Sequence, residues 1–359
     1  IEQNVILLDS VSKRYSECGL RVGALVTRNK EVMAAALKFG MARLCAPAIG
    51  QIVAEASLDT PAEYFESVYN EYIERRDFMV EALNKVGGAN GIGKTLALGF
   101  AKRGSDVAII DIHGDEAEAV AKEIRGMGRK SFAMQADVSV LDECKAILDK
   151  TMAEFGRCDV LVNNAGVSAL SDVEHIPEKD IRWVYETNVY SHWFMMQNFL
   201  PQMRSQKSHC QIINVCSIAG LISMNGAPAY FSSKHAAVAL SECVYKQLKA
   251  DKADIDVSIF CPGYINTEMH LTDRHRPERF AIRDDEPYYH TEEYAKFVAF
   301  NKYLLENGAD VNVAVETIFK ALEKEQFYIL DTPKYERLLC EQGVFEAEKV
   351  RPVDFYTLN

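Results

Sequence analysis

The sequence predicts an α/β protein whose larger part is a doubly wound parallel sheet with helices on both faces. From Gly87 onward, apolar strand-like runs alternate with amphipathic helical patterns, and this βαβ rhythm is typical of a parallel sheet covered on both sides. A glycine-rich turn leads into a helical pattern at the start of this part, as phosphate-binding loops do. The first 86 residues are mainly helical in pattern. We therefore expect two unlike parts, residues 1–86 and 87–359.

The strands of the second part are predicted from short apolar stretches bounded by polar residues. They are DVAIID, SFAMQADV, DVLVNNAG, QIINVCS, DVSIFCPG and, near the C-terminus, FYILD. In the first part, NVILLDS and GALVTRN are strand-like. A helical pattern then runs from Lys30 to Leu83, with breaks at CAPAIG and SLDTPAEY.

The composition is that of a globular protein, with 48% hydrophobic and 26% charged residues among 359. No apolar run approaches the roughly 18 residues of a membrane span, and the charged N-terminal stretch is not a secretory signal. The net charge of -12 argues against a general affinity for nucleic acid or anionic lipid. Nine cysteines without a C-x-x-C pair indicate reduced thiols in a cytoplasmic protein.

The glycine-rich turn consists of Gly87, Gly91 and Gly93 in the pattern G-x-x-x-G-x-G. Missing side chains let the backbone approach a pyrophosphate, and the N-terminus of the following helix faces its charge. Glycine-rich turns are common, so a plain tight turn explains this signal equally well when it is taken alone.

Asp111 closes the run DVAIID, eighteen residues after Gly93. A carboxylate there can accept hydrogen bonds from both ribose hydroxyls of an adenosine, and it repels a 2′-phosphate. No arginine follows directly to offset that repulsion, although Lys94 and His113 are near in sequence. An aspartate at a strand end is more often a helix cap, but at this distance from a glycine turn it predicts NAD rather than NADP.

Short polar motifs follow in the second part. They are NNAG at Asn163–Gly166, Asn188 in ETNVY, Ser217 in NVCSIAG, and YFSSK with Tyr230 and Lys234. Together with the glycine turn, they resemble the short-chain dehydrogenase/reductase family over about Gly87 to Asn359. The resemblance implies a Rossmann-type sheet and an NAD-dependent oxidoreductase that interconverts a secondary alcohol and a ketone. Taken singly, the same residues are ordinary surface or turn positions.

Tyr230 and Lys234 lie one helical turn apart, so their side chains share a face. A free phenol has a pKa near ~10, but an adjacent ammonium favours the phenolate. Tyr230 can then exchange a proton with the substrate oxygen while hydride moves. The resemblance implies that Lys234 also holds the nicotinamide ribose and that Ser217 donates a hydrogen bond to the substrate oxygen. It also implies that Asn188 supports a water path behind Lys234.

The resemblance implies a set of cofactor-binding positions. They are Gly87, Asn90, Gly91, Ile92, Gly93, Asp111, Asp137, Val138, Asn163, Ala165, Gly166, Tyr230, Lys234, Pro262, Gly263 and Thr267. In the family, the positions of Asp137 and Val138 flank the adenine, and those from Pro262 to Thr267 border the nicotinamide.

Substrate choice is expected to lie in the segment after Gly263. Its larger apolar residues either line a pocket or pack as lid and core; they are Tyr264, Met269, Phe280, Tyr288 and Tyr289. The histidines of the same region show no metal-like spacing, so we expect solvated surface positions and no metal site; they are His270, His275 and His290.

The first part has a signature of its own. SVSKRYSECGLRVG places Ser10, Lys13 and Arg21 in the spacing of the pyridoxal-phosphate (PLP) site of the aspartate aminotransferase family (fold type I), and the similarity extends to about Val86. In that family the lysine forms the Schiff base, and the serine and arginine hold the phosphate. The other residues of that site have no counterparts here. We therefore read Lys13 as structural and expect no working PLP site.

The junction between the two parts poses a structural problem. A phosphate loop follows a central strand, yet MVEALNKV, Met79 to Val86, has the spacing of a helix. This stretch could be forced into a strand, a segment such as VGALVT could fill the gap in the sheet, or the chain could join pieces of two proteins, as an engineered chimera or a splice over missing residues would. We favour the chimera, in which the dehydrogenase part lacks its first strand.

The expected assembly is a homotetramer or homodimer that acts on an apolar small molecule. In the family that the chain resembles, the helices after NVYSHWFMM and around Tyr230 form subunit contacts. Apolar residues there suit both core and partner: Trp193, Phe194, Met195, Ala236, Ala237 and Val238.

Overall fold

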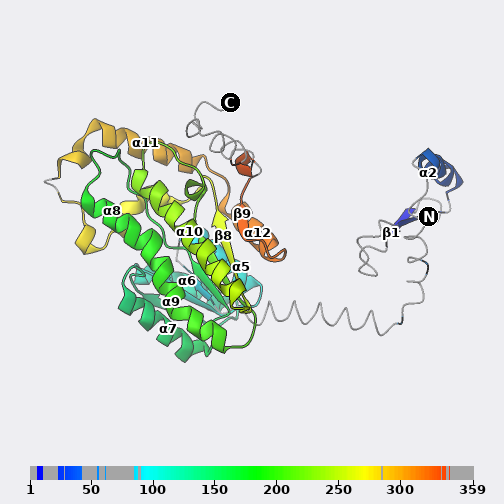
Figure 1. Ribbon diagram of the computed structural model, residues 1–359, viewed down its shortest axis with the longest axis horizontal. Coiled ribbons are helices and arrows are strands. Elements are labelled where there is room, and N and C mark those ends of the chain that lie inside the picture. Colours follow the sequence, from blue (N-terminus) through cyan, green and yellow to red (C-terminus); the bar gives the residue numbers. More distant parts are fainter. Residues whose placement is uncertain are drawn as a thin grey trace. The chain divides into compact units, whose positions relative to one another are not determined.

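The computed structural model contains two compact units, Ile1–Arg76 and Asp77–Asn359 (Figure 1). The residues that it describes are 6–10, 23–27, 29–42, 55, 61, 85–87, 90–283, 286–332, 334–336 and 339. Within these ranges, no helix combines the length and the apolar character that crossing a bilayer requires.

The first unit contains a small antiparallel sheet and a helix among its described residues. β1 (Ile6–Ser10) pairs with β2 (Gly23–Thr27), and α2 (Lys30–Ala42) follows. The side-chain oxygen of Asn29 caps α2, since it accepts hydrogen bonds from the first amides of the helix. Because β2 pairs with β1, the explanation that VGALVT fills the gap in the large sheet is wrong.

The second unit is built on a parallel sheet, seven-stranded in the described residues, with the order β5-β4-β3-β6-β7-β8-β9. The strands are β3 (Lys85–Gly87), β4 (Val107–Asp111), β5 (Ser131–Gln135), β6 (Val160–Asn163), β7 (Cys210–Val215), β8 (Ile255–Cys261) and β9 (Tyr328–Leu330). Each strand-like run predicted after Gly87 overlaps one of β4 to β9, so the doubly wound fold class is confirmed.

β3 lies at the centre of this sheet. Val86 is in register with Ala108 of β4 on one side and with Leu161 of β6 on the other. The expectation that this part lacks its first strand is therefore wrong, and a missing strand no longer supports a chimera. If β3 were absent, the neighbouring strands β4 and β6 would each leave a row of backbone groups unpaired inside the core. That cost outweighs a local helical preference. The preceding residues 79–84 lie outside the described residues.

Helices cover both faces of the sheet (Figure 1). One layer contains α7 (Leu141–Phe155), α9 (Ser191–Ser205) and α10 (Pro228–Ala250), and the other contains α5 (Gly91–Lys102), α6 (Gly114–Gly126) and α12 (Val311–Leu322). Strand residues alternate between the layers: Ile110 packs in the first and Ile109 in the second. Burial on both faces explains why the strands are continuous apolar runs.

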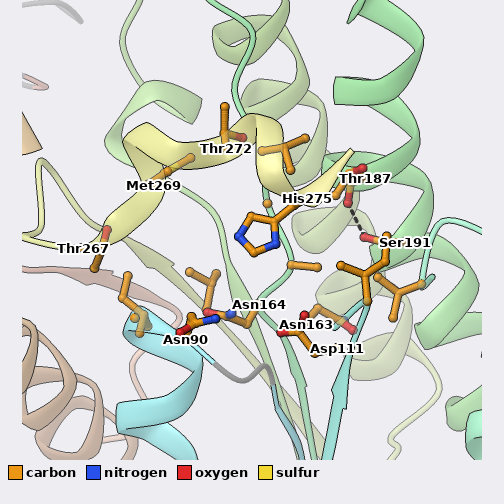
Figure 2. A pocket seen from close by; sticks show the side chains of 18 of the residues that line it. Asn90, Asp111, Asn163, Asn164, Thr187, Ser191, Thr267, Met269, Thr272 and His275 are labelled. Atoms are coloured by element: carbon orange, nitrogen blue, oxygen red, sulfur yellow. Dashed lines mark hydrogen bonds between the residues drawn. The ribbon is translucent and has the colours of Figure 1, made fainter. Parts of the chain in front are cut away.

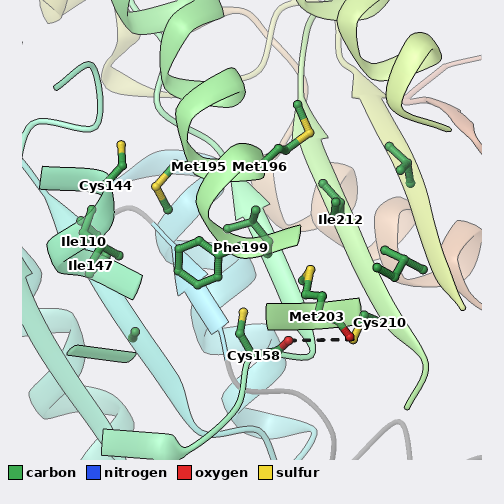
Figure 3. Close-up of a cluster of buried hydrophobic side chains, with 14 of the residues drawn as sticks. Ile110, Cys144, Ile147, Cys158, Met195, Met196, Phe199, Met203, Cys210 and Ile212 are labelled. Atoms are coloured by element: carbon green, nitrogen blue, oxygen red, sulfur yellow. Dashed lines mark hydrogen bonds between the residues drawn. The ribbon is translucent and has the colours of Figure 1, made fainter. Parts of the chain in front are cut away.

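The first layer encloses a core of aromatic, aliphatic and sulfur-containing side chains (Figure 3). Phe199 and Met203 of α9 are buried together with Ile147 of α7 and Ile212 of β7. The thiol of Cys144 lies in the same cluster, and burial raises its pKa to about 12. This cysteine is therefore a protonated core residue rather than a nucleophile.

Irregular segments cross the carboxyl ends of the strands. α8 (Glu178–Tyr185) continues through the π-helical turn η4 (Glu186–Tyr190) into α9. After β8, the chain forms the short helical segments η6 (Glu268–His275), η7 (Glu278–Phe280) and η8 (Pro287–His290) before α11 (Glu292–Glu306).

The central position of β3 predicts the effect of removing one backbone donor. Val86→Pro should lower the free energy of unfolding of the second unit by about 3 kcal/mol, because proline removes an N–H from the ladder and leaves its acceptor unpaired. The change in the free energy of unfolding can be measured by urea unfolding, monitored through the near-ultraviolet signal of the two tryptophans. Val86→Ala is the matched control, since it trims the side chain but keeps the N–H. Equal stability of the two variants would contradict the central ladder.

Candidate active site

A cavity lies at the carboxyl ends of the strands, where the chain order reverses between β3 and β6 (Figure 2). Doubly wound proteins bind ligands at such a point. The lining includes most of the candidate residues: Asn90, Gly91, Ile92, Asp111, Asp137, Val138, Asn163, Ala165, Gly166, Ser217, Tyr230, Lys234, Pro262, Gly263 and Thr267. The remaining candidates lie close behind it: Gly87 in β3, Gly93 buried in α5, and Asn188 buried next to Gly166.

The glycine turn brings the N-terminus of α5 to the cavity, where Asn90, Gly91 and Ile92 are lining residues. Gly91 begins this helix with a φ of 51°, a left-handed backbone conformation that favours glycine. A Cβ on Gly91 would also lie 3.2 Å from Cγ2 of Thr267. The first amides of a helix are natural donors to an anion, so this end of α5 can bind one.

The ammonium of Lys234 is buried at the inner wall of the cavity. Its Nζ donates to the carbonyl oxygen of Val215 at 3.2 Å, and among the described residues it has no second hydrogen-bond acceptor. A Cβ on Gly166 would lie 3.2 Å from this Nζ, so a larger residue there would press against the ammonium. Burial lowers the pKa of Lys234. Because an ammonium carries three donors, two remain available to a ligand.

Tyr230 lies one turn before Lys234 on α10, with the Lys234 Nζ 5.7 Å from the centre of its ring. Burial raises the pKa of Tyr230 to about 12, and a hydrogen bond with Ser217 opposes that shift. Desolvation therefore dominates the pKa of Tyr230 in the protein alone, and Ser217 rather than Lys234 opposes the shift. At neutral pH, Tyr230 carries its proton and can donate it.

Ser217 is fixed where β7 ends. Its Oγ accepts a hydrogen bond from the amide of Ala219 at 3.1 Å, and this bond begins the short helical segment η5 (Ile218–Gly220). Its hydroxyl lies 3.5 Å from the carbonyl oxygen of Pro262. These contacts from two strand ends hold the hydroxyl beside that of Tyr230.

Asn188 holds the backbone next to Lys234. It is fully buried in η4, where its Oδ1 accepts from the amide of Val167 at 2.8 Å and its Nδ2 donates to the carbonyl of Val167 at 2.9 Å. The Nδ2 also donates to Oγ of Ser233 at 3.0 Å. These bonds fix the turn that contains Gly166, and with it the wall against which Lys234 packs.

Asn163 connects strands beneath the cavity. Its Nδ2 donates to Oδ1 of Asn214 at 2.7 Å, and Nδ2 of Asn214 donates to Oγ of Ser241 at 2.8 Å. Because all three side chains are buried, this chain of hydrogen bonds ties β6 and β7 to α10 and keeps the strand ends in place.

The far end of the cavity carries two carboxylates. Asp111 closes β4 and accepts a hydrogen bond from the amide of His113 at 3.1 Å. Asp137 pairs with Arg279 at 2.8 Å and accepts from the amide of Ser139 at 3.0 Å. The segment after β8 thus reaches across to this end, which the sequence analysis did not predict.

At the opposite end, residues after β9 hold the backbone at Gly263. The amide of Gly263 donates to Oδ1 of Asp331 at 3.2 Å. A Cβ on Gly263 would lie 1.8 Å from the hydroxyl oxygen of Tyr335. No larger residue fits at this position unless Tyr335 moves.

The expected substrate residues divide into two groups. Met269 lines the cavity. Phe280 is buried in a cluster with Trp183, while the hydroxyls of Tyr288 and Tyr289 donate to Leu170 O and Asp180 Oδ2, each at 3.0 Å. These three aromatic residues pack as a lid around α8, and Tyr264 is not part of the cavity lining.

The expectation that the nearby histidines are solvated surface is wrong for two of them. His275 is half-buried and lines the cavity, as do Thr272 and Arg274. His270 is half-buried, and its Nδ1 has no hydrogen-bond partner within the described ranges. His290 is exposed. Sequence reasoning missed the lining residues because an irregular segment has no periodicity that marks its inward side.

A group of possible metal ligands lies outside the cavity lining. Ligand atoms of Asp172, His175 and Glu293 come within 4.8 Å of one another. Nδ1 of His175 is 2.8 Å from Asp172, and this contact raises the pKa of His175 while lowering that of Asp172. An exposed ion pair accounts for the arrangement.

Of the expected PLP residues, Ser10 ends β1, while Lys13 and Arg21 lie outside the described residues.

The cavity has the donors and acceptors that a dinucleotide requires. The N-terminus of α5 suits a pyrophosphate, and Asp111 offers a carboxylate to ribose hydroxyls. Lys234 offers donors near Tyr230 at the other end. A nicotinamide dinucleotide therefore fits the residues present.

Two family models match the chain. The short chain dehydrogenase model matches residues 85–278, and the aminotransferase class I and II model matches residues 2–124. The aminotransferase similarity thus extends beyond Val86, through β4 and into α6, and the two matches share residues 85–124.

Curated relatives and solved structures resemble mainly the second unit. A CLA biosynthesis dehydrogenase/reductase from Lactiplantibacillus plantarum is 35% identical over 264 residues, which cover 74% of this chain and 92% of the relative. A diacetyl reductase from Staphylococcus epidermidis is 36% identical over 183 residues, 51% of this chain and 70% of the relative. A short-chain dehydrogenase/reductase from Burkholderia phymatum, solved in complex with NAD, has a TM-score of 0.74 and 25% identity, and the match covers 77% and 98% of the two chains. The chain belongs to the short-chain dehydrogenase/reductase family.

Proposed function

We propose that this protein is an NAD-dependent oxidoreductase that interconverts a secondary alcohol and a ketone. The proposal rests on one observation above all: Tyr230, hydrogen-bonded to Ser217, shares a cavity wall with the buried ammonium of Lys234. A proton donor, a second hydroxyl and a cation at one point suit a reaction in which charge develops on a substrate oxygen.

In the direction of ketone reduction, Tyr230 donates its proton to the substrate oxygen. The dinucleotide, when bound, supplies the hydride. Ser217 donates a hydrogen bond to the same oxygen and stabilises its developing charge. Lys234 holds ribose hydroxyls through its free donors, and its charge stabilises the tyrosinate that remains. Asn188 acts at a distance, because it fixes the wall behind Lys234.

The cofactor preference is assigned to Asp111. A carboxylate at this strand end hydrogen-bonds the ribose hydroxyls of NAD and repels the 2′-phosphate of NADP. The similar structure from Burkholderia phymatum was solved with NAD, which supports the same assignment here.

The substrate is proposed to be an apolar small molecule. The apolar side chains of Met269 and Leu305 line the cavity, as do Thr267 and Gly263. One relative is by its name a diacetyl reductase, an enzyme of a small molecule, which supports a small substrate here.

The aminotransferase match favours a second candidate, a PLP-dependent protein, and a nucleotide-binding pseudoenzyme is a third. An assay of NADH formation from NAD with a panel of secondary alcohols distinguishes these three candidate functions. NADH formation supports the oxidoreductase. An imine absorption band with added PLP and no NADH supports the second, and NAD binding without either signal supports the third.

Tyr230→Phe should lower kcat by about a hundredfold or more, because the ring remains but the proton-donating oxygen is lost. NAD binding, measured by calorimetry, should stay within about twofold of the parent. Adding Phe231→Tyr to the Tyr230→Phe variant supplies a hydroxyl at the next position in sequence and should not restore turnover. Turnover within a few-fold of the parent in Tyr230→Phe would contradict the assigned role.

The double variant Asp111→Ser, Ile112→Arg should shift the ratio of kcat/KM values from NAD toward NADP. It removes the repelling carboxylate and supplies a guanidinium for the 2′-phosphate. Asp115→Ser in the first turn of α6 is a control for loss of one negative charge nearby. A parent enzyme that already prefers NADP would contradict this reading of Asp111.

A homo-oligomer is proposed from the outer face of α9. Trp193 is 53% exposed and Tyr190 is 48% exposed, whereas Met195, Ala237 and Val238 are core residues.

Trp193→Glu should convert a dimer or tetramer into a monomer in light scattering at micromolar concentration, since it places a charge in the apolar contact. Val173→Glu, at an exposed turn, should leave the mass unchanged. A monomeric parent would refute the proposal.

A further inference from the structure

The η6 segment brings a histidine from the substrate side to the far end of the cavity. Figure 2 shows the His275 ring between η6 and the strand-end residues Asp111 and Asn163. The ring is half-buried and lines the same cavity as Asp111 and Asp137. In sequence, His275 lies more than a hundred residues beyond these strand ends.

Contacts on both sides of His275 fix the ring. Nε2 of His113 is 3.1 Å from the carbonyl oxygen of Arg274, and the rings of His113 and His275 lie 5.1 Å apart. Nε of Arg274 donates to Nε2 of His275 at 3.1 Å. Nε2 of His275 is therefore an acceptor, and a neutral His275 carries its proton on Nδ1.

The next residues fasten the segment to the rest of the fold. Arg276 and Asp180 form a buried ion pair at 2.6 Å, and Arg276 also stacks over Trp183 of α8, 4.0 Å from the ring centre. Arg279 pairs with Asp137 at the far end of the cavity. A segment tied at these points keeps His275 over the strand ends with little freedom to turn away.

The charge around the ring favours a neutral imidazole. Burial and the neighbouring Arg274 and His113 lower the pKa of His275, while Asp111 and Glu116 oppose that shift. At pH 7 the ring is therefore an uncharged, flat heteroaromatic group. Ile112, Val138 and the two carboxylates line the same cavity as the ring. A cavity lined by an imidazole and aliphatic side chains suits a flat, uncharged base.

We infer that His275 is a cofactor-binding residue that stacks on the adenine and forms the second wall of the adenosine subsite. This inference rests on the proposed function, because it takes the ligand to be an adenine dinucleotide. The inference implies that the segment that includes the cavity residue Met269 also binds the cofactor.

Calorimetric titration with AMP, nicotinamide mononucleotide and NAD tests this inference. In His275→Ala, the Kd for AMP and for NAD should rise about tenfold, as loss of one base-stacking contact implies. The Kd for nicotinamide mononucleotide should not change, since that half of the cofactor lies near Lys234. His275→Phe keeps a flat ring and should bind AMP within about threefold of the parent.

His290→Ala is the matched control, because His290 is an exposed histidine of the same region, and its Kd values should equal those of the parent. AMP binding that is equal in His275→Ala and the parent would overturn the inference while the proposed function stands. If His275→Phe bound AMP as weakly as His275→Ala does, stacking of the ring on the adenine would be ruled out. A parent that binds neither AMP nor either dinucleotide would overturn the proposed function as well.

Discussion

Backbone pairing of β3 with β4 on one side and β6 on the other is the interaction on which the rest of the second unit depends. A parallel sheet buried on both faces has no water to satisfy a missing strand, so the centre must be filled. β3 is only three residues long in the structure, Lys85–Gly87, but it fixes where the glycine turn emerges. It also creates the point at which the chain order reverses, and the cavity opens there.

The chemistry of the cavity follows from what the neighbouring strands and α10 hold in place. Hydrogen bonds among buried amide and hydroxyl side chains keep β6, β7 and α10 together below Lys234. Asn188 fixes the turn that packs against the ammonium, and burial keeps Tyr230 protonated. The protein thus keeps a cation and a proton donor in a desolvated wall, where their interactions with a ligand are stronger than in water.

Sequence reasoning predicted the features that local patterns encode. The strands β4 to β9, the glycine turn and the helical-turn spacing of Tyr230 and Lys234 all have a period or a short motif. It failed where tertiary contacts decide. Val86 lies in a strand because two neighbours require a partner, although its own segment has a helical pattern. The position of His275 depends on contacts with residues such as His113, which is far away in sequence, and the protonation of Tyr230 depends on burial.

Hydrogen–deuterium exchange of individual backbone amides shows whether Lys85–Gly87 forms the middle of the sheet. Amides within a central ladder open only with the whole unit, whereas amides of exposed turns exchange rapidly. The β3 amides paired with β4 and β6 should therefore exchange as slowly as those of Ala108 and Ile109. Exchange as fast as that of the exposed turn at Val173 would contradict it.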